Sequence, residues 1–292
     1  SYNVIDDAQI SMVNLVIGIV IAALVAVVLL GGVKRIGTVT EKLVPFMAVF
    51  YIILAIGVVV LNADKVPHVF EMIFVGAFNP QAIGGGVLGW TVSRAMARGV
   101  GRGLFSNEAG MGSTPHAHAV AKVDHPCEQG FVAMMGVFID TFIVLTLTAL
   151  VILTSGMVGE IDPLTNAAYT GTALTQVGFS SVFGKFGEIF IAICMFFFAF
   201  STIIGWYFFG EANIKYLFGS KAVKVYAVLV AVCIVAGAGQ KVDLIWNMAD
   251  CFNSAMVIPN VIGLWALSGM VKKVHNDYFH NFKPNQLKNR TK

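Results

Sequence analysis

Long apolar stretches separated by short polar ones run along most of the chain. Residues 12–32 and 189–210 carry no charged side chain, and residues 130–156 carry one, Asp140. None of these stretches alternates with the period of two that is typical of strands. A helix needs about 20 apolar residues to cross a bilayer, so the pattern predicts an all-α integral membrane protein. We expect one transmembrane domain over residues 1–292 with about seven spans, at 12–33, 43–61, 66–104, 130–155, 187–210, 222–239 and 243–271.

Most positively charged residues fall on one side of the membrane if the chain crosses it at these spans. If successive loops alternate sides, 16 of the 19 Lys and Arg residues fall on one side, and the other side holds only Lys65, Lys185 and Lys241. Cytoplasmic loops of membrane proteins carry the excess of Lys and Arg. We therefore expect the first residue of the chain outside the cell and the tail, 272–292, in the cytoplasm.

Composition agrees with a membrane protein and excludes several other classes. Hydrophobic residues make up 57% of the chain and charged residues 12%, about half the charged fraction of a soluble domain. The net charge of +3 gives no reason to expect nucleic acid as a partner. The four cysteines form no CxxC pair, and no nucleophile–base or metal motif stands out, so we predict neither an enzyme nor an organic cofactor. Because the chain begins at Ser1, close to its first apolar stretch, we expect it to be the C-terminal part of a longer protein.

The third apolar segment is interrupted near its middle. Residues 66–78 are apolar, and Pro80 and three glycines follow in 79–86 before a second helix expected from about residue 87 to 105. Proline removes a backbone donor and glycine favours unwinding. Unwound backbone at membrane depth lines substrate sites in secondary transporters. The alternatives are an ordinary loop between two short helices, or a kink without function.

The fifth segment has two adjacent hydroxyls, Ser201 and Thr202, in mid-span. Hydroxyl oxygens are hard ligands that suit Na⁺, and Thr202 shares a helix face with Trp206 four residues later. Such a face could line a small pocket. The alternative is that both hydroxyls donate to carbonyls of the preceding turn, as is common in membrane helices.

Two acidic residues are expected at membrane depth. Asp140 lies in the fourth segment, and Asp250 lies in the last, with Asn247 and Asn253 at a spacing of three on either side. Acidic side chains inside a membrane are functional candidates by default. They could gate, bind an ion or relay protons, but we favour structural pairing with neighbouring helices.

A stretch after the third segment is the most distinctive motif. It reads Arg-Gly-Leu-Phe-Ser-Asn-Glu-Ala-Gly-Met-Gly-Ser at 102–113. Together with 136–141, 198–202, 205–206, 210–211 and 249–250, in that order along nearly the whole chain, it resembles the sodium:alanine (or glycine) symporter family.

The resemblance implies the inverted-repeat fold of the amino acid-polyamine-cation superfamily. The chain would supply the last two helices of the first five-helix repeat and all five of the second, with the broken segment 66–104 opening the second repeat. The family implies a Na⁺ site formed by the Phe198 carbonyl, Ser201 and Thr202. It also implies substrate contacts from the residues Thr202, Trp206, Gln81, Gly84, Gly85 and Gly86.

The function implied by the resemblance is Na⁺-coupled symport of a small neutral amino acid, alanine or glycine, by alternating access across the plasma (inner) membrane. One alternative is a proton-coupled transporter with Asp140 or Asp250 as the proton carrier. Another is an intramembrane enzyme or receptor component.

Overall fold

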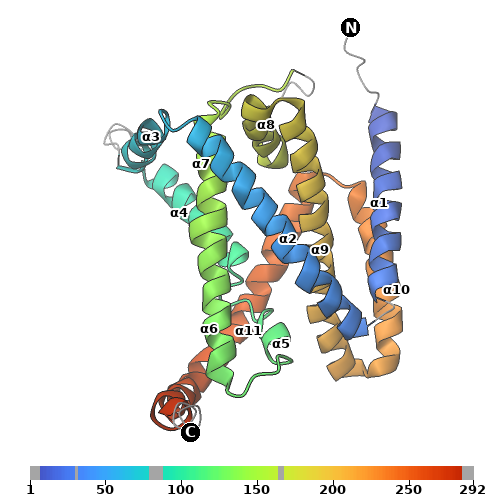
Figure 1. Cartoon of the computed structure of the whole chain (residues 1–292). Coiled ribbons are helices and arrows are strands. Elements are labelled where there is room, and N and C mark those ends of the chain that lie inside the picture. The colour runs from blue at the N-terminus through green and yellow to red at the C-terminus, as the bar shows by residue number, and fades with distance from the viewer. Residues whose placement is uncertain (1–6, 30–31, 79–87, 164–167, 285–292) are drawn as a thin grey trace. The chain divides into compact units, whose positions relative to one another are not determined.

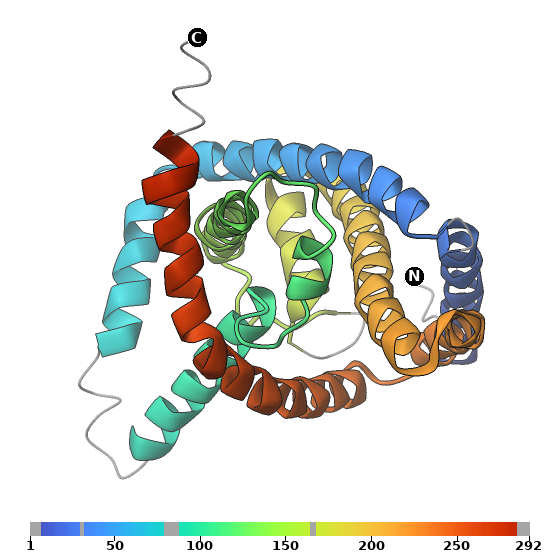
Figure 2. The same cartoon turned by 90° about the horizontal axis from the view of Figure 1, so that it is seen from below.

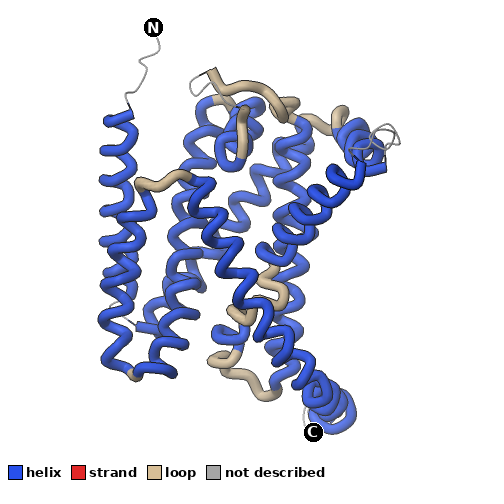
Figure 3. Tube along the Cα trace, turned by 180° about the vertical axis from the view of Figure 1, so that it is seen from behind, coloured by secondary structure: helices blue, strands red, loops and turns tan. Residues whose placement is uncertain are grey.

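The computed structural model describes residues 7–29, 32–78, 88–163 and 168–284 (Figure 1). In these residues the chain is helical apart from turns, loops and one isolated antiparallel β-bridge between Ile161 and Ala168 (Figure 3). This confirms the predicted all-α class. The inverted-repeat arrangement stays a prediction.

Six helices in the described residues are long and apolar enough to cross a membrane. They are Met12–Leu29, Arg35–Leu61, Pro126–Thr154, Lys185–Phe218, Ser220–Ala238 and Leu244–Phe282. The remaining expected span, 66–104, falls on a shorter apolar helix, α3 (Val66–Phe78), and on α4 (Leu88–Ser106), and residues 79–87 between them lie outside the described residues. The division of the chain into seven spans stays a prediction.

The chain divides into two compact units, which we describe separately. The first comprises Ser1–Gly89 and Phe142–Gln240, and the second Trp90–Thr141 and Lys241–Lys292. Besides α3, the first unit holds α1 (Asp7–Leu29), α2 (Gly32–Leu61), α7 (Thr146–Thr154), α8 (Gly171–Phe183), α9 (Lys185–Phe218) and α10 (Ser220–Ala238). Besides most of α4, the second holds α5 (Pro115–His118), α6 (Pro126–Phe138), α11 (Val242–Asp277) and the π-helix η3 (Tyr278–Phe282).

Two apolar clusters, both involving α9, hold the first unit together. One joins α9 to α1, α2 and α10, and its buried members are Val25, Val28, Leu29, Ile36, Ile204 and Tyr207. The other joins α9 to α2, α7 and α8, and its buried members are Tyr51, Ala55, Val58, Val151, Phe179 and Ile191. Figures 1 and 2 both show α1 and α10 side by side. The middle of α9 is therefore packed on two sides, which fixes the direction in which its other side chains point.

Glycines set the close spacing of α8 and α9. Gly184, with φ of 56°, is the single residue between the two helices, and an L-residue rarely adopts this backbone conformation. A Cβ placed on Gly187 would lie 2.6 Å from the carbonyl oxygen of Phe179. Small residues at helix contacts allow backbones to approach closely in membranes. The sequence analysis missed α8, because its 13 residues are too few for a span.

Candidate functional site

The middle of α9 presents the predicted Na⁺ ligands. The Ser201 hydroxyl donates to the Phe198 carbonyl oxygen at 3.0 Å, so the expected hydroxyl and carbonyl are neighbours on one helical turn. This is also the back-bonding arrangement that the sequence analysis held as its alternative. Thr202 is exposed, and Trp206 is half-buried with its ring 5.8 Å from that of Phe209.

Thr202 and Trp206 lie on a face of α9 that the α1–α10 cluster leaves free. Phe200, Ile204 and Tyr207 pack into that cluster. At about 100° per residue, Thr202 and Trp206 are turned to the opposite side of the helix. The structure thus keeps these two predicted substrate residues together on one accessible face.

The other four predicted substrate residues belong to the segment between α3 and α4. Gln81, Gly84, Gly85 and Gly86 all lie in 79–87, outside the described residues. The helices on either side end at Phe78 and begin at Leu88. Their contact with substrate stays a prediction.

Asp140 has a partner within the second unit. Its Oδ2 accepts a hydrogen bond from the Ser106 hydroxyl at 2.8 Å, and the neighbouring Thr141 donates to Oδ1 of Asn107 at 2.7 Å. Asp140 and Thr141 lie at the start of a π-helical segment, η2 (Ile139–Leu145). Single π-helical turns inside α-helices are frequent at functional sites. The side-chain bonds tie the end of α4 to the start of η2.

Asp250 is also paired within the second unit. Arg102 donates to both carboxylate oxygens, at 3.2 and 3.4 Å, and its guanidinium carbon lies 4.3 Å from the centre of the Trp246 ring. A cavity of about 260 Å³ adjoins this pair and is lined in part by Asn253, whereas Asn247 is exposed. Both acids therefore have side-chain partners in the second unit, and a structural or gating role for either stays a prediction.

The distinctive 102–113 motif forms a compact hydrogen-bonded turn. Oε2 of Glu108 accepts from the hydroxyls of Ser113 at 2.5 Å and Thr114 at 2.6 Å. Asn260 of α11 donates to the Gly110 carbonyl at 2.9 Å, and a Cβ on Gly112 would lie 2.8 Å from the Asn260 side chain. The motif thus anchors the end of α4 to α11. The sequence analysis used these residues for the resemblance and gave Glu108 no role.

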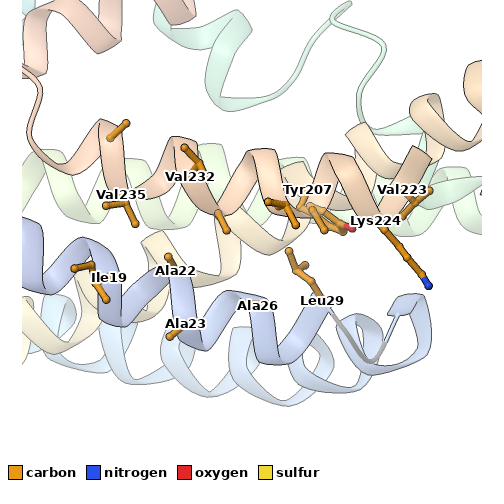
Figure 4. A pocket seen from close by; sticks show the side chains of 14 residues that line it. Ile19, Ala22, Ala23, Ala26, Leu29, Tyr207, Val223, Lys224, Val232 and Val235 are labelled. Carbon is orange, nitrogen blue, oxygen red and sulfur yellow. The ribbon is translucent and has the colours of Figure 1, made fainter. Parts of the chain in front are cut away.

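An apolar groove of about 1050 Å³ lies between α1 and α10 in the first unit, away from the free face of α9. Alanines of both helices line the groove, and their small side chains leave the space between the helices unfilled. The polar residues in its lining are Lys224 and Tyr207, which lie near one end (Figure 4). It contains none of the predicted site residues. Among the described residues, no group of three or more His, Cys, Asp or Glu side chains gathers as a metal site would require.

The sequence analysis also missed Glu211. Its predicted span ended at residue 210, but α9 continues to Phe218 and carries Glu211 within it. A spacing signal was available, because 200, 204, 207 and 211 fall on one helical stripe and the first three pack into the α1–α10 cluster. An acidic residue that continues an apolar stripe is unusual.

Comparison with known proteins gives a family and named relatives. The model of the sodium:alanine symporter family matches residues 1–292. The sodium/alanine symporter of Methanococcus maripaludis is 41% identical over 275 residues, covering 94% of this chain and 59% of that protein. A probable sodium/glutamine symporter of Bacillus subtilis is 40% identical over 266 residues, covering 91% and 54%.

The name of a third relative includes protons as well as sodium. The sodium/proton-dependent alanine carrier protein of Bacillus sp. strain PS3 is 37% identical over 282 residues, covering 92% of this chain and 62% of that protein. The chain thus spans 54% to 62% of the length of these three relatives.

Proposed function

Because the chain belongs to the sodium:alanine symporter family, a family of transporters and not of enzymes, we propose that it takes part in Na⁺-coupled symport of alanine or glycine. It is a multi-pass membrane protein, and its coupling ion is expected to be Na⁺. The relatives' names support a small amino acid as substrate, although one of them names glutamine. We place it in the plasma (inner) membrane with its first residue outside and its tail in the cytoplasm.

The observation that carries this proposal is the free face of α9. Na⁺ is bound by the Phe198 carbonyl and the hydroxyls of Ser201 and Thr202, and the adjacency of the first two oxygens at 3.0 Å supports this assignment. Hard oxygen ligands of this kind suit alkali and alkaline-earth cations. The Ser201 hydroxyl can turn from donating to the carbonyl toward presenting its lone pairs to the ion.

The substrate site lies beside the ion. Thr202 and Trp206 contact the amino acid from α9, and Gln81 with the backbone of Gly84, Gly85 and Gly86 meets it from the segment between α3 and α4. The broken segment opens the second inverted repeat, and its half-helix ends hold the carboxylate of the substrate. Na⁺ binding creates the amino-acid site, and occupation of both sites permits the change to the inward-open state.

Proton coupling is the second candidate, because one relative is named for both sodium and protons. In that mechanism Asp140 or Asp250 carries the proton. In the structure each of these carboxylates already has a side-chain partner, Ser106 for Asp140 and Arg102 for Asp250.

Uptake of labelled alanine, glycine and glutamine by the intact protein in liposomes tests the proposal. Replacing external Na⁺ with choline is expected to abolish uptake of the transported substrate. Thr202→Ala should raise the Na⁺ concentration for half-maximal uptake about tenfold, for a loss of about 1.4 kcal/mol.

The matched control is Thr175→Ala on α8, a half-buried threonine that bonds back to the Gly171 carbonyl at 3.3 Å. It should behave as the wild type. Uptake that persists in choline and collapses with the pH gradient would reject Na⁺ coupling. Unchanged Na⁺ dependence in Thr202→Ala would remove this residue from the site.

A further inference from the structure

One carboxylate in the first unit lacks a hydrogen bond at one of its oxygens. Oε2 of Glu211 is buried and has no hydrogen-bond partner among the residues that the structure describes. Glu211 lies one turn beyond Tyr207 on α9, on the stripe that faces α1 and α10. Leaving a buried polar atom unpaired costs about 1–3 kcal/mol, and more when the group is charged.

Two tyrosine side chains stand close to Glu211, one on α9 and one on α10. The rings of Tyr207 and Tyr226 stack at 5.2 Å, bringing α10 against this part of α9. The hydroxyl of Tyr226 occupies the space that a side chain at Gly210 would need. The apolar groove between α1 and α10 reaches Tyr207, and Lys224 lines the same end of it.

Charged groups on the surrounding helices are few. On α9 itself Lys215 stands one turn later and is exposed. On α10 the lysines are Lys221 and Lys224, both exposed, and α1 has no titratable side chain from residue 12 to 29. On α2 the charged residues of the first turns whose side chains are described are Arg35, Glu41 and Lys42, and the buried residue of the cluster is Ile36. None of these cations is within ion-pair distance of Glu211 in the described residues.

Glu211 therefore differs from the two acids considered for proton coupling. Asp140 receives a hydroxyl hydrogen bond, and Asp250 receives two bonds from a guanidinium group. A buried carboxyl oxygen without a donor favours the protonated acid, because protonation removes the charge that burial penalises.

We propose that Glu211 is a proton-binding site at the contact between α9 and α10, with H⁺ as its ligand. The protonated, uncharged acid is compatible with the stacked Tyr207–Tyr226 pair. The ionised form requires water, so deprotonation loosens this helix contact. The site acts alongside the Na⁺ site on the opposite face of α9, and only its effect on uptake rests on the proposed function.

Carbodiimide labelling of the intact protein in membranes tests the site without transport. Dicyclohexylcarbodiimide adds to a protonated carboxyl group in apolar surroundings, and mass spectrometry locates the adduct. Labelling of Glu211 is expected at about pH 5 and should fall by about tenfold per pH unit above the pKa of its carboxyl. Glu188, exposed in the first turn of the same helix, is the matched control and should not be labelled. Absence of labelling at Glu211 at every pH would overturn the proposal and indicate a permanent basic partner.

The effect on transport is tested by Glu211→Gln, which mimics the protonated acid, with Glu188→Gln as control. Wild type and Glu188→Gln should share one dependence of uptake on pH, and Glu211→Gln should lose it. An unchanged pH profile in Glu211→Gln would overturn the coupling of the site to transport. If the wild type shows no Na⁺-dependent uptake, the proposed function fails, whereas the labelling result still decides the proton site.

Discussion

The two units differ in what holds each of them together. Of the 18 buried hydrophobic residues in the described chain, only Met111 lies in the second unit, and the others belong to the first. The second unit buries Ser113 and His125 instead and is linked by side-chain hydrogen bonds such as Ser106 to Asp140 and Asn260 to Gly110. The first unit is thus held together by close packing of apolar side chains, and the second by hydrogen bonds between polar side chains.

This difference has physical consequences in a bilayer. Lipid tails are as apolar as leucine, so close packing of helices and not hydrophobic transfer stabilises the first unit. Packed contacts resist gradual deformation. Hydrogen-bonded side chains can exchange partners, which makes the second unit better suited to changing its internal arrangement.

The largest effect is expected from disturbing the packing of the first unit. Gly187→Ala places a methyl group 2.6 Å from the backbone oxygen of Phe179, which cannot move aside without shifting α8. We expect a loss of about 3 kcal/mol, seen in unfolding of the protein in mixed micelles. Gly205→Ala on the same helix has open space around it and should not destabilise. Equal stability of the two variants would contradict the packing account.

A smaller effect is expected from removing an acceptor in the second unit. Glu108→Ala leaves the hydroxyl of Ser113, which is 2% exposed, without its carboxylate partner. A loss of about 2 kcal/mol should follow, with faster proteolysis between residues 107 and 125. Glu160→Ala, in an exposed loop, serves as the control. If proteolysis between residues 107 and 125 is as slow in Glu108→Ala as in the wild type, the bonds from Ser113 and Thr114 to Glu108 do not order this turn.

The smallest effect is expected at the Arg102–Asp250 pair, whose side chains are 39% and 48% exposed. A double-mutant cycle with Arg102→Ala and Asp250→Ala should give a coupling of about 0.5 kcal/mol, because solvent screens such pairs. The unfolding midpoints of the four proteins provide the measurement. A coupling several times larger would mean that this pair, and not the Glu108 turn, dominates the second unit.

The sequence predicted most of the secondary structure because long apolar runs without charge form helices when they cross a membrane. It missed α8, since 13 residues interrupted by Thr, Gln and Ser give no span signal. The resemblance named Ser201 and the Phe198 carbonyl as Na⁺ ligands, and the structure joins these two groups by a hydrogen bond, whereas their binding of Na⁺ stays a prediction. The sequence did not identify Glu211, because hydropathy ended the span at residue 210 and only the structure shows that one oxygen of this carboxylate is buried.

The close approach of Tyr226 to Gly210 also has a consequence for how this sequence can vary. Any side chain at position 210 would occupy the volume of the Tyr226 hydroxyl and displace its ring from Tyr207. The two positions, 16 residues apart on different helices, therefore constrain each other's substitutions. Homologues with a Cβ at position 210 should carry a shorter residue at position 226, so this one contact would appear as a covarying pair in the family.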